Sequence, residues 1–240
     1  MAIADALNEI LEKMARAREA APLAAPRLRL MGASKGQGEQ AIEEAIAAGL
    51  TLFGENRVQE AQGKWPAIRA RHPGLELHLI GPLQTNKVRE ALALFDVIQT
   101  LDREKLALAL AKEMGMGRGD DVKMPGISRH PDIPTSPHRT FYIQINTGEE
   151  PQKAGIAPGE ADGFIRFCRD ELALPIGGLM CVPPADQPAA PHFALLRDIG
   201  QRNGLSELSM GMSGDFETAI RMGSGCVRIG TALFGARIAA

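Results

Sequence analysis

Lys35 is the side chain in this sequence best placed to act as an amine nucleophile. It follows the apolar run Leu28–Ala33, the first of eight such runs along the chain. In a barrel of alternating strands and helices, the residues that follow each strand gather at one mouth, where such folds keep their chemistry. A lysine at that mouth can condense with the carbonyl group of a ligand to form a Schiff base. In the alternative interpretation, Lys35 is an ordinary loop residue.

Two other strand ends have the composition of phosphate-binding loops. Residues 211–216 lead from the seventh apolar run into a helix and include Ser213, and residues 229–232 follow the eighth run and include Gly230 and Thr231. Barrels often bind phosphate between these two loops, because backbone N–H groups and helix N-termini converge there and glycine lets the anion come close. In a purely structural interpretation, Ser213 and Thr231 serve only as N-caps of their helices.

A lysine amine combined with a phosphate site narrows the chemistry to two classes, a Schiff-base aldolase and a protein that binds pyridoxal 5'-phosphate. Arg228 partly distinguishes these two classes, because it could contact the ring of a bound pyridoxal phosphate. It lies near the end of the eighth run, which adjoins the first in a closed barrel, so its guanidinium can reach a pyridine nitrogen beside Lys35. An arginine there would weaken the electron-sink character of the ring. The alternative for Arg228 is a salt bridge to Glu55, Asp102 or Asp215.

The elements that must position these residues alternate along the chain. Apolar runs predict strands at Leu28–Ala33, Leu50–Phe53, Glu76–Ile80, Asp96–Leu101, Thr140–Asn146, Pro175–Val182, Glu207–Met210 and Cys226–Ile229. Amphipathic stretches predict helices at Glu39–Ala48, Val58–Ala70, Thr85–Leu94, Arg103–Met114, Gly159–Leu172, Ala189–Asn203 and Asp215–Met222. This alternation favours an α/β fold, a single-domain (β/α)8 TIM barrel over residues 1–240. An open doubly wound sheet is the alternative, but no GxGxxG motif supports its switch point.

Two segments fall outside the alternation. Residues 2–19 have helical period and precede the first strand, which predicts an extra N-terminal helix covering one end of the barrel. Residues 115–139 are rich in proline and glycine and poor in large apolar side chains, which predicts a loop insertion.

Composition indicates a small-molecule ligand. The 240 residues are 45% hydrophobic, and 27 basic against 29 acidic side chains leave a net charge of -2, so no field favours nucleic acid or an anionic membrane. The three cysteines, Cys168, Cys181 and Cys226, lack metal-ligand spacing, which predicts reduced core thiols, no metal site and a cytoplasmic location. The first residues do not have the pattern of a signal peptide, and no apolar run approaches the ~20 residues of a membrane span.

Several motifs resemble the pyridoxal phosphate homeostasis protein family, single-domain relatives of the alanine racemase barrel. The resemblance runs from about residue 28 to 237, and its most specific blocks are Ala33-Ser34-Lys35, FGENRVQE at 53–60, HLIGPLQTNK at 78–87 and VRIGTALFGAR at 227–237. It departs from the family where Gly36-Gln37-Gly38 replaces the Thr-Lys-Pro more often found after the lysine, and at the insertion 115–139.

The resemblance implies a role for each matched residue. Lys35 corresponds to the lysine that holds pyridoxal phosphate as an internal aldimine, and Asn56 to an asparagine that lines the cofactor pocket. Ser213, Gly230 and Thr231 correspond to phosphate-binding positions, and Arg228 to the arginine that faces the pyridine nitrogen. Met210 and Met180 would form apolar walls around the ring, or else are ordinary core methionines.

We interpret the chain as a cytoplasmic pyridoxal phosphate-binding homeostasis protein and not as an enzyme. The resemblance implies that a racemase needs a second base, a tyrosine from a C-terminal domain, whereas this sequence ends at Ala240 and its one tyrosine, Tyr142, lies within the fifth predicted strand. The expected partners are the cofactor and pyridoxal phosphate-dependent apo-enzymes, with no nucleic acid or membrane. The alternatives are a pyridoxal phosphate-dependent enzyme with weak racemase-like activity and a Schiff-base aldolase.

Overall fold

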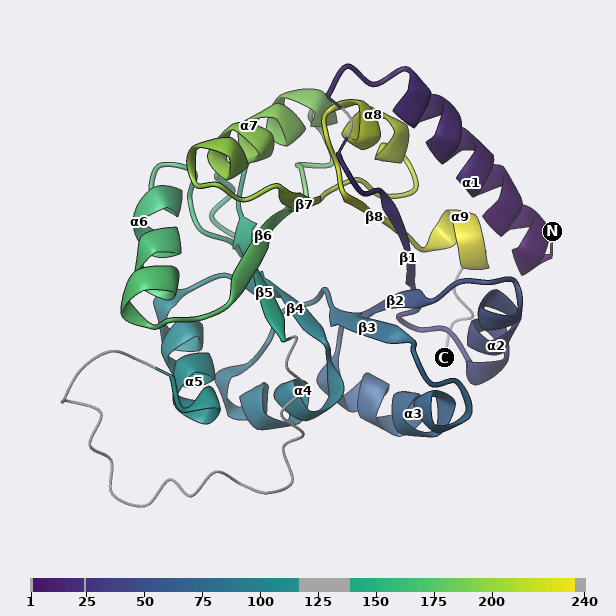
Figure 1. Cartoon of the computed structure of the whole chain (residues 1–240), viewed down its shortest axis with the longest axis horizontal. Helices are drawn as coiled ribbons and strands as arrows, with labels where there is room; N and C mark the ends of the chain where they lie inside the picture. Colours follow the sequence, from purple (N-terminus) through teal and green to yellow (C-terminus); the bar gives the residue numbers. More distant parts are fainter. Residues whose placement is uncertain (1, 24, 117–138, 236–240) are drawn as a thin grey trace.

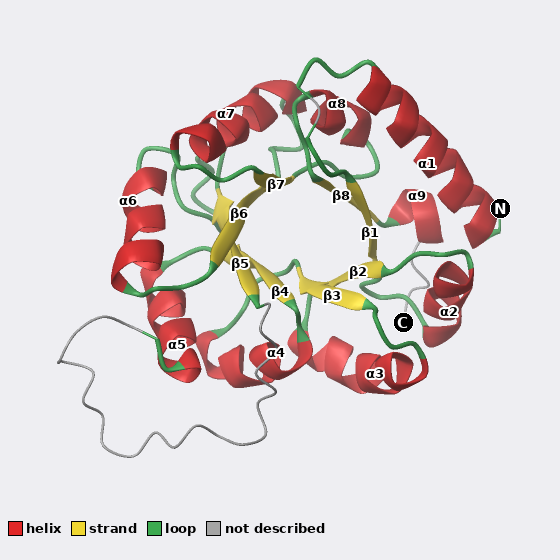
Figure 2. Ribbon diagram, viewed as in Figure 1, coloured by secondary structure: helices red, strands yellow, loops and turns green. Residues whose placement is uncertain are grey.

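Eight parallel strands form a closed barrel in the order of the sequence (Figures 1 and 2). The computed structural model describes residues 2–23, 25–116 and 139–235. The strands are β1 (Arg29–Ala33), β2 (Leu52–Glu55), β3 (Glu76–Leu79), β4 (Val97–Leu101), β5 (Thr140–Ile145), β6 (Ile176–Cys181), β7 (Glu207–Ser209) and β8 (Cys226–Ile229). Strand β8 closes the barrel by pairing with β1, with Met31 opposite Arg228. The predicted TIM barrel is therefore confirmed.

Helices surround the barrel as an outer ring (Figure 2). They are α1 (Ile3–Glu19), α2 (Glu39–Ala47), α3 (Val58–Arg71), η1 (Thr85–Lys87), α4 (Val88–Leu94), α5 (Glu104–Met114), α6 (Ala161–Arg166), η3 (Phe167–Glu171), α7 (Ala189–Arg202), α8 (Phe216–Arg221) and α9 (Thr231–Phe234). Two predicted helices are each divided: Thr85–Leu94 begins as the 3-10 turn η1, and Gly159–Leu172 ends in the π-helical turn η3. The predicted insertion 115–139 lies largely outside the described residues.

The second strand begins two residues later than predicted, because Leu50 still belongs to the end of α2. Gly49 has a φ of 97°, and the N–H of Leu50 donates to the carbonyl of Ala45 at 3.0 Å. Such a six-to-one bond after a left-handed glycine closes a helix and leaves the next apolar residue packed against it. The buried Leu50 side chain is therefore a helix-cap contact, and the strand starts at Leu52.

The N-terminal helix exists, but the prediction that it covers one end of the barrel is wrong. Helix α1 lies in the outer ring, where it packs against α8, α9 and α2 (Figure 1). The helix that follows β8 is α9, which has only 4 residues. Short as it is, α9 packs against β1 through Leu233 and Phe234, and the apolar face of α1, with Leu7, Ile10 and Met14 buried, extends the helical layer on this side of the barrel.

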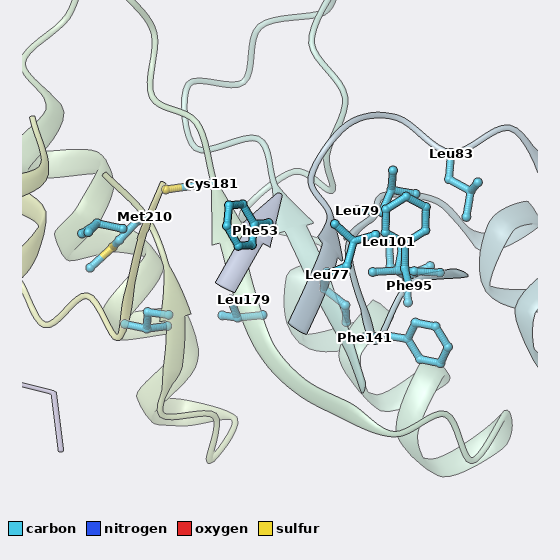
Figure 3. Close-up of a cluster of buried hydrophobic side chains, with 14 of the residues drawn as sticks. Phe53, Leu77, Leu79, Leu83, Phe95, Leu101, Phe141, Leu179, Cys181 and Met210 are labelled. Atoms are coloured by element: carbon cyan, nitrogen blue, oxygen red, sulfur yellow. The ribbon is translucent and has the colours of Figure 1, made fainter. Parts of the chain in front are cut away.

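Side chains alternate between two faces of each strand, and the two faces differ in chemistry. The outward face joins the helices in one large apolar core, part of which is drawn in Figure 3 with Phe53, Leu77, Leu79 and Phe141. The inward face holds two small apolar clusters, Met31 with Leu52 and Cys226, and Val97 with Tyr142 and Met180. The remaining inward positions are largely polar, and they shape the site described below.

The three cysteines are free and buried. Burial raises the pKa of the Cys168 and Cys181 thiols to about 12 and that of Cys226 to about 11, so these thiols are inert at neutral pH. Within the described ranges, no cluster of His, Cys, Asp and Glu side chains is suited to hold a metal ion. None of the described helices is long and apolar enough to span a membrane.

Candidate functional site

Lys35 is half-buried at the carboxyl end of β1, at the tip of a turn. The turn is closed by a bond from the N–H of Gln37 to the carbonyl of Ser34 at 3.0 Å. Ser34 also donates its hydroxyl to Oε1 of Glu55 at 2.6 Å, which ties the turn to the end of β2. The chain therefore presents the Lys35 amine from a backbone that is anchored to the neighbouring strand.

Asn56 follows β2 and supplies a buried polar atom that lacks a partner. Its Oδ1 makes no hydrogen bond within the described part of the chain. The residue lines a cavity of about 570 Å³ together with Gln84 and Lys87. Gly81 keeps Asn56 in place by close backbone contact, because a Cβ at position 81 would stand 2.2 Å from the Asn56 carbonyl oxygen. An orphaned acceptor beside a cavity is suited to receive a hydrogen bond from a ligand.

The two loops predicted to bind phosphate meet each other. The N–H of Ala232 donates to Oγ of Ser213 at 3.3 Å, so Ser213 contacts the first turn of α9 from the loop that follows β7. Thr231 is exposed at the start of α9. A Cβ at Gly230 would lie 3.6 Å from the Cβ and carbonyl oxygen of Ala33, which places this loop beside the end of β1. Asp215 and Gly230, not Ser213 and Thr231, are therefore the N-cap residues of α8 and α9, and the contact between the two loops leaves both of them beside the strand end that precedes Lys35.

Arg228 is a buried cation held by two neutral acceptors. One terminal nitrogen donates to Oγ of Ser209 at 2.8 Å and the other to the carbonyl of Cys181 at 2.8 Å. Burial lowers the pKa of the guanidinium below its ordinary value. The alternative of a salt bridge to an acidic strand end is wrong for the described residues, since Glu55 pairs with Lys64 and Asp102 with Arg103. Asp215, the third candidate, accepts the backbone N–H of Met212.

A chain of hydrogen bonds runs from Arg228 through the inside of the barrel. Ser209 donates its hydroxyl to Oε1 of Gln99 at 2.6 Å, and Nε2 of Gln99 contacts Nδ1 of His78 at 2.8 Å. Nε2 of His78 lies 2.6 Å from Oε1 of Glu76, which also accepts from Arg29 at 3.0 Å on β1. Each of Ser209, Gln99 and His78 is at most 1% exposed. We refer to Arg228, Ser209, Gln99, His78, Glu76 and Arg29 as the interior chain.

The direction of the hydrogen bonds along the interior chain follows from which groups can donate. Because the Gln99 amide nitrogen can only donate, Nδ1 of His78 accepts and Nε2 carries the proton toward Glu76. Burial lowers the pKa of His78, in keeping with this neutral tautomer. Burial alone would raise the pKa of Glu76, but the bonds from His78 and Arg29 lower it to about 2. A cation therefore stands at the carboxyl-terminal mouth and a carboxylate at the opposite one.

The opposite mouth contains a cavity of about 690 Å³ lined by Arg29, Glu76, Tyr142 and Glu207. No residue of the predicted site lies there. Active sites of this fold occupy the carboxyl-terminal mouth, so we assign the functional site to the end that carries Lys35. Tyr142 is thereby placed at the far end of the barrel from Lys35.

The two predicted methionine walls lie on different faces. Met210 is fully buried in the large outer core, in the cluster of Figure 3 that also includes Cys181. Its neighbour Ser209 points inward to Arg228, so Met210 points toward the helices. Met180 faces inward, where it packs with Val97 and Tyr142. The structure does not bring either side chain together with Lys35, and a contact with a ligand ring stays a prediction for both.

Sequence reasoning missed Ser209, Gln99 and His78. Each is a polar strand residue at an inward position, next in sequence to a buried leucine or isoleucine. A buried polar residue needs a partner, and that requirement is the signal that could have singled them out. The pairing itself joins strands as distant in sequence as β4 and β7, which one sequence does not show.

Comparison with known proteins places the chain in a family. Residues 6–238 match the family model of the alanine racemase N-terminal domain. The pyridoxal phosphate homeostasis protein of Vibrio cholerae is 36% identical over 241 residues, which cover 96% of this chain and 94% of the relative. That of Pseudomonas aeruginosa is 36% identical over 240 residues, 98% and 96% of the two chains.

A solved structure supports the same grouping. PipY of Synechococcus elongatus, determined with PLP bound, is 32% identical and superposes with a TM-score of 0.73 over 97% of this chain and 100% of that one. Sequence and fold agree over nearly the whole length. This chain therefore belongs to the pyridoxal phosphate homeostasis protein family, which is built on the alanine racemase N-terminal domain.

Proposed function

We propose that this protein binds pyridoxal 5'-phosphate reversibly through Lys35 and thereby helps to maintain the intracellular level of the cofactor. The observation that carries the proposal is the meeting, at one mouth, of the Lys35 turn, the linked loops of Ser213 and Ala232, and the inward Arg228. The names of the relatives and the PLP-bound structure of PipY support it. When bound, the cofactor supplies an aldehyde that condenses with an amine.

The residues present fit this ligand. Ser213, Gly230 and Thr231 would hold the phosphate, and the unpartnered Oδ1 of Asn56 offers a buried acceptor. Arg228 would face the pyridine nitrogen, with its guanidinium already oriented by Ser209 and by the carbonyl of Cys181. An arginine donates to an unprotonated ring nitrogen and so weakens the ring as an electron sink.

The position of Tyr142 supports a carrier and not a racemase. Racemisation needs a proton donor and acceptor on opposite faces of the bound substrate, and this chain contains one tyrosine. Tyr142 lines the cavity at the amino-terminal mouth, and burial raises its phenol pKa further above the ordinary value. A phenol so placed cannot serve as the second base beside Lys35. The expected recipients of the cofactor are apo-enzymes in the cytoplasm.

Borohydride trapping tests the proposal. Reduction converts an imine on a lysine into a stable amine, so the purified protein incubated with pyridoxal phosphate should lose its visible absorbance band and gain one pyridoxyl group on Lys35. Lys35→Ala should show neither change, while Lys112→Ala, at an exposed lysine of α5, should behave as wild type. Peptide mapping that placed the label mainly on Lys87 or Lys153 would contradict the assignment.

A further inference from the structure

The turn that carries Lys35 is held from behind by three charged side chains, Glu55, Glu60 and Lys64, which we call the Lys64 clamp. Glu55 ends β2, and Glu60 and Lys64 stand one turn apart on α3. Lys64 is 12% exposed and Glu55 is fully buried. None of the three is among the residues expected to contact the ligand, and Glu55 already accepts the Ser34 hydroxyl.

The clamp binds backbone groups on both sides of Lys35. Nζ of Lys64 donates to the carbonyl of Ser34 at 3.1 Å and to that of Gln37 at 3.3 Å. Oε1 of Glu60 accepts the N–H of Gly36 at 2.6 Å. The residue before Lys35 and the two residues after it are therefore each bonded to a charged group of α3, and such bonds are about twice as strong as neutral ones.

The clamp is itself internally paired. Nζ of Lys64 lies 2.8 Å from Oε1 of Glu55 and 3.0 Å from Oε1 of Glu60. Oε1 of Glu55 additionally accepts from Nε1 of Trp65 at 3.0 Å. An ammonium has three N–H groups, and those of Lys64 face four oxygens, so this amine is committed to the turn. It is therefore no competitor of Lys35 for an aldehyde.

Glycines make such a clamp necessary. Gly36 has a φ of 68°, in the left-handed region, and no atom lies within 4 Å of the place that a Cβ of Gly38 would occupy. Neither glycine therefore has a side chain whose packing could fix the backbone of the turn. Glycine-rich segments lose more conformational entropy on ordering than others. Without outside bonds, the turn would populate many backbone conformations, and the Lys35 amine would point in a different direction in each.

We propose that Lys64, held by Glu55 and Glu60, is the positioning residue that directs the Lys35 amine toward its aldehyde ligand. The inference rests on the proposed function and adds to it how the reactive lysine is oriented. Apparent affinity falls with the fraction of molecules in the competent conformation, so loosening the turn should weaken every step that uses the Lys35 amine. Binding that does not use the amine should be spared.

The experiment compares two ligands that differ in one group. Pyridoxal 5'-phosphate carries the aldehyde, whereas pyridoxamine 5'-phosphate carries an amine in its place and cannot form an imine with lysine. For Lys64→Met, we expect the rate constant of the borohydride-trappable adduct on Lys35 to fall by at least about tenfold, because the turn loses two charged hydrogen bonds and the loss of one is already worth about tenfold. The dissociation constant of pyridoxamine phosphate, measured by calorimetry, should stay within about twofold of wild type. Lys112→Met is the matched control and should change neither value.

A second variant guards against loss of the fold, because Lys64→Met leaves the buried carboxylate of Glu55 without its cation. Glu60→Gln keeps an acceptor for Gly36 and should slow trapping by about threefold. An unchanged trapping rate in the folded variants, or an equal loss for both ligands, would overturn the inference while the proposed function stands. A wild-type protein that forms no adduct on Lys35 would overturn both.

Discussion

Replacing Gln99 by leucine should destabilise the barrel by a measurable amount, because Gln99 is the central link of the interior chain. Its amide accepts from Ser209 at 2.6 Å and donates to His78 at 2.8 Å, and Gln99 itself is fully buried. Leucine has nearly the same size, so the change removes two hydrogen bonds without opening a large cavity. The cost then reports the polar network and not the packing.

The magnitude follows from the groups left behind. The hydroxyl of Ser209 and Nδ1 of His78 would each lose a partner in a place that water does not reach. Leaving a buried polar group unsatisfied costs about 1–3 kcal/mol. Two such groups give about 2–6 kcal/mol, and the greater apolarity of leucine offsets part of this, so we expect a net loss of about 2–4 kcal/mol. In a chain of this size, the melting temperature should fall by about 5–15 °C.

Urea unfolding followed by circular dichroism measures this loss, with Gln62→Leu as the matched control. Gln62 is exposed on α3, and the same substitution there should change stability by less than about 0.5 kcal/mol. The double variant Gln99→Leu with Ser209→Ala should lose less stability than the sum of the two single variants, because both substitutions remove the same hydrogen bond, from Ser209 to Gln99. Additive effects, or a Gln99→Leu protein as stable as the control, would show that the interior chain does not form.

Three further predictions test the site and its surroundings. Ser213→Ala should weaken the affinity for pyridoxal phosphate by about 1.5–3 kcal/mol in calorimetry, as expected for a hydrogen bond to a charged group, and an equal loss for pyridoxal would contradict a phosphate contact. In the folded protein, the pKa values of His78 and Glu76 lie below their ordinary values of 6.5 and 4.5, so the unfolded chain binds more protons. The free energy of unfolding should therefore fall as the pH drops below about 6.5, because of His78. It should fall further between pH 4.5 and about 2, because of Glu76. His78→Gln should flatten the first decline in a urea titration at each pH. Wild-type protein should interconvert alanine enantiomers far more slowly than the ~1–10³ s⁻¹ of typical enzymes, and enzyme-like rates in a coupled assay that Lys35→Ala abolished would refute the carrier.

Local patterns were sufficient to predict the barrel. Alternating apolar runs and amphipathic stretches located every strand, and β8 agrees with the prediction at both ends. The start of β2 was predicted two residues too early, because the buried Leu50 belongs to the end of α2 and not to the strand. The predicted position of α1 was wrong for a different reason. Whether an extra helix covers an end or a side depends on where the outer ring leaves room for it, and α1 packs beside α9, which has only 4 residues.

The candidate site was predicted unevenly. The family resemblance and the strand ends singled out Lys35, Ser213 and Arg228, since their positions in the chain already imply one mouth. The residues that orient them were not predicted. In the sequence, Lys64 has the pattern of an ordinary surface residue of an amphipathic helix. Its role depends on the four oxygens that the fold brings around it.

The interior chain connects the stability of the barrel with the orientation of its site. A buried guanidinium needs acceptors, and among the described residues the two hydrogen-bond acceptors of Arg228 are neutral. The carboxylate of the interior chain, that of Glu76, is reached through Ser209, Gln99 and His78. Hydrogen bonds in such a series polarise one another, so each link strengthens the acceptor offered to Arg228. A break at Gln99 frees the Ser209 hydroxyl to turn, and the guanidinium then loses one of its two fixed acceptors. Gln99→Leu should therefore weaken ligand binding as well as stability, although Gln99 lies outside the proposed site.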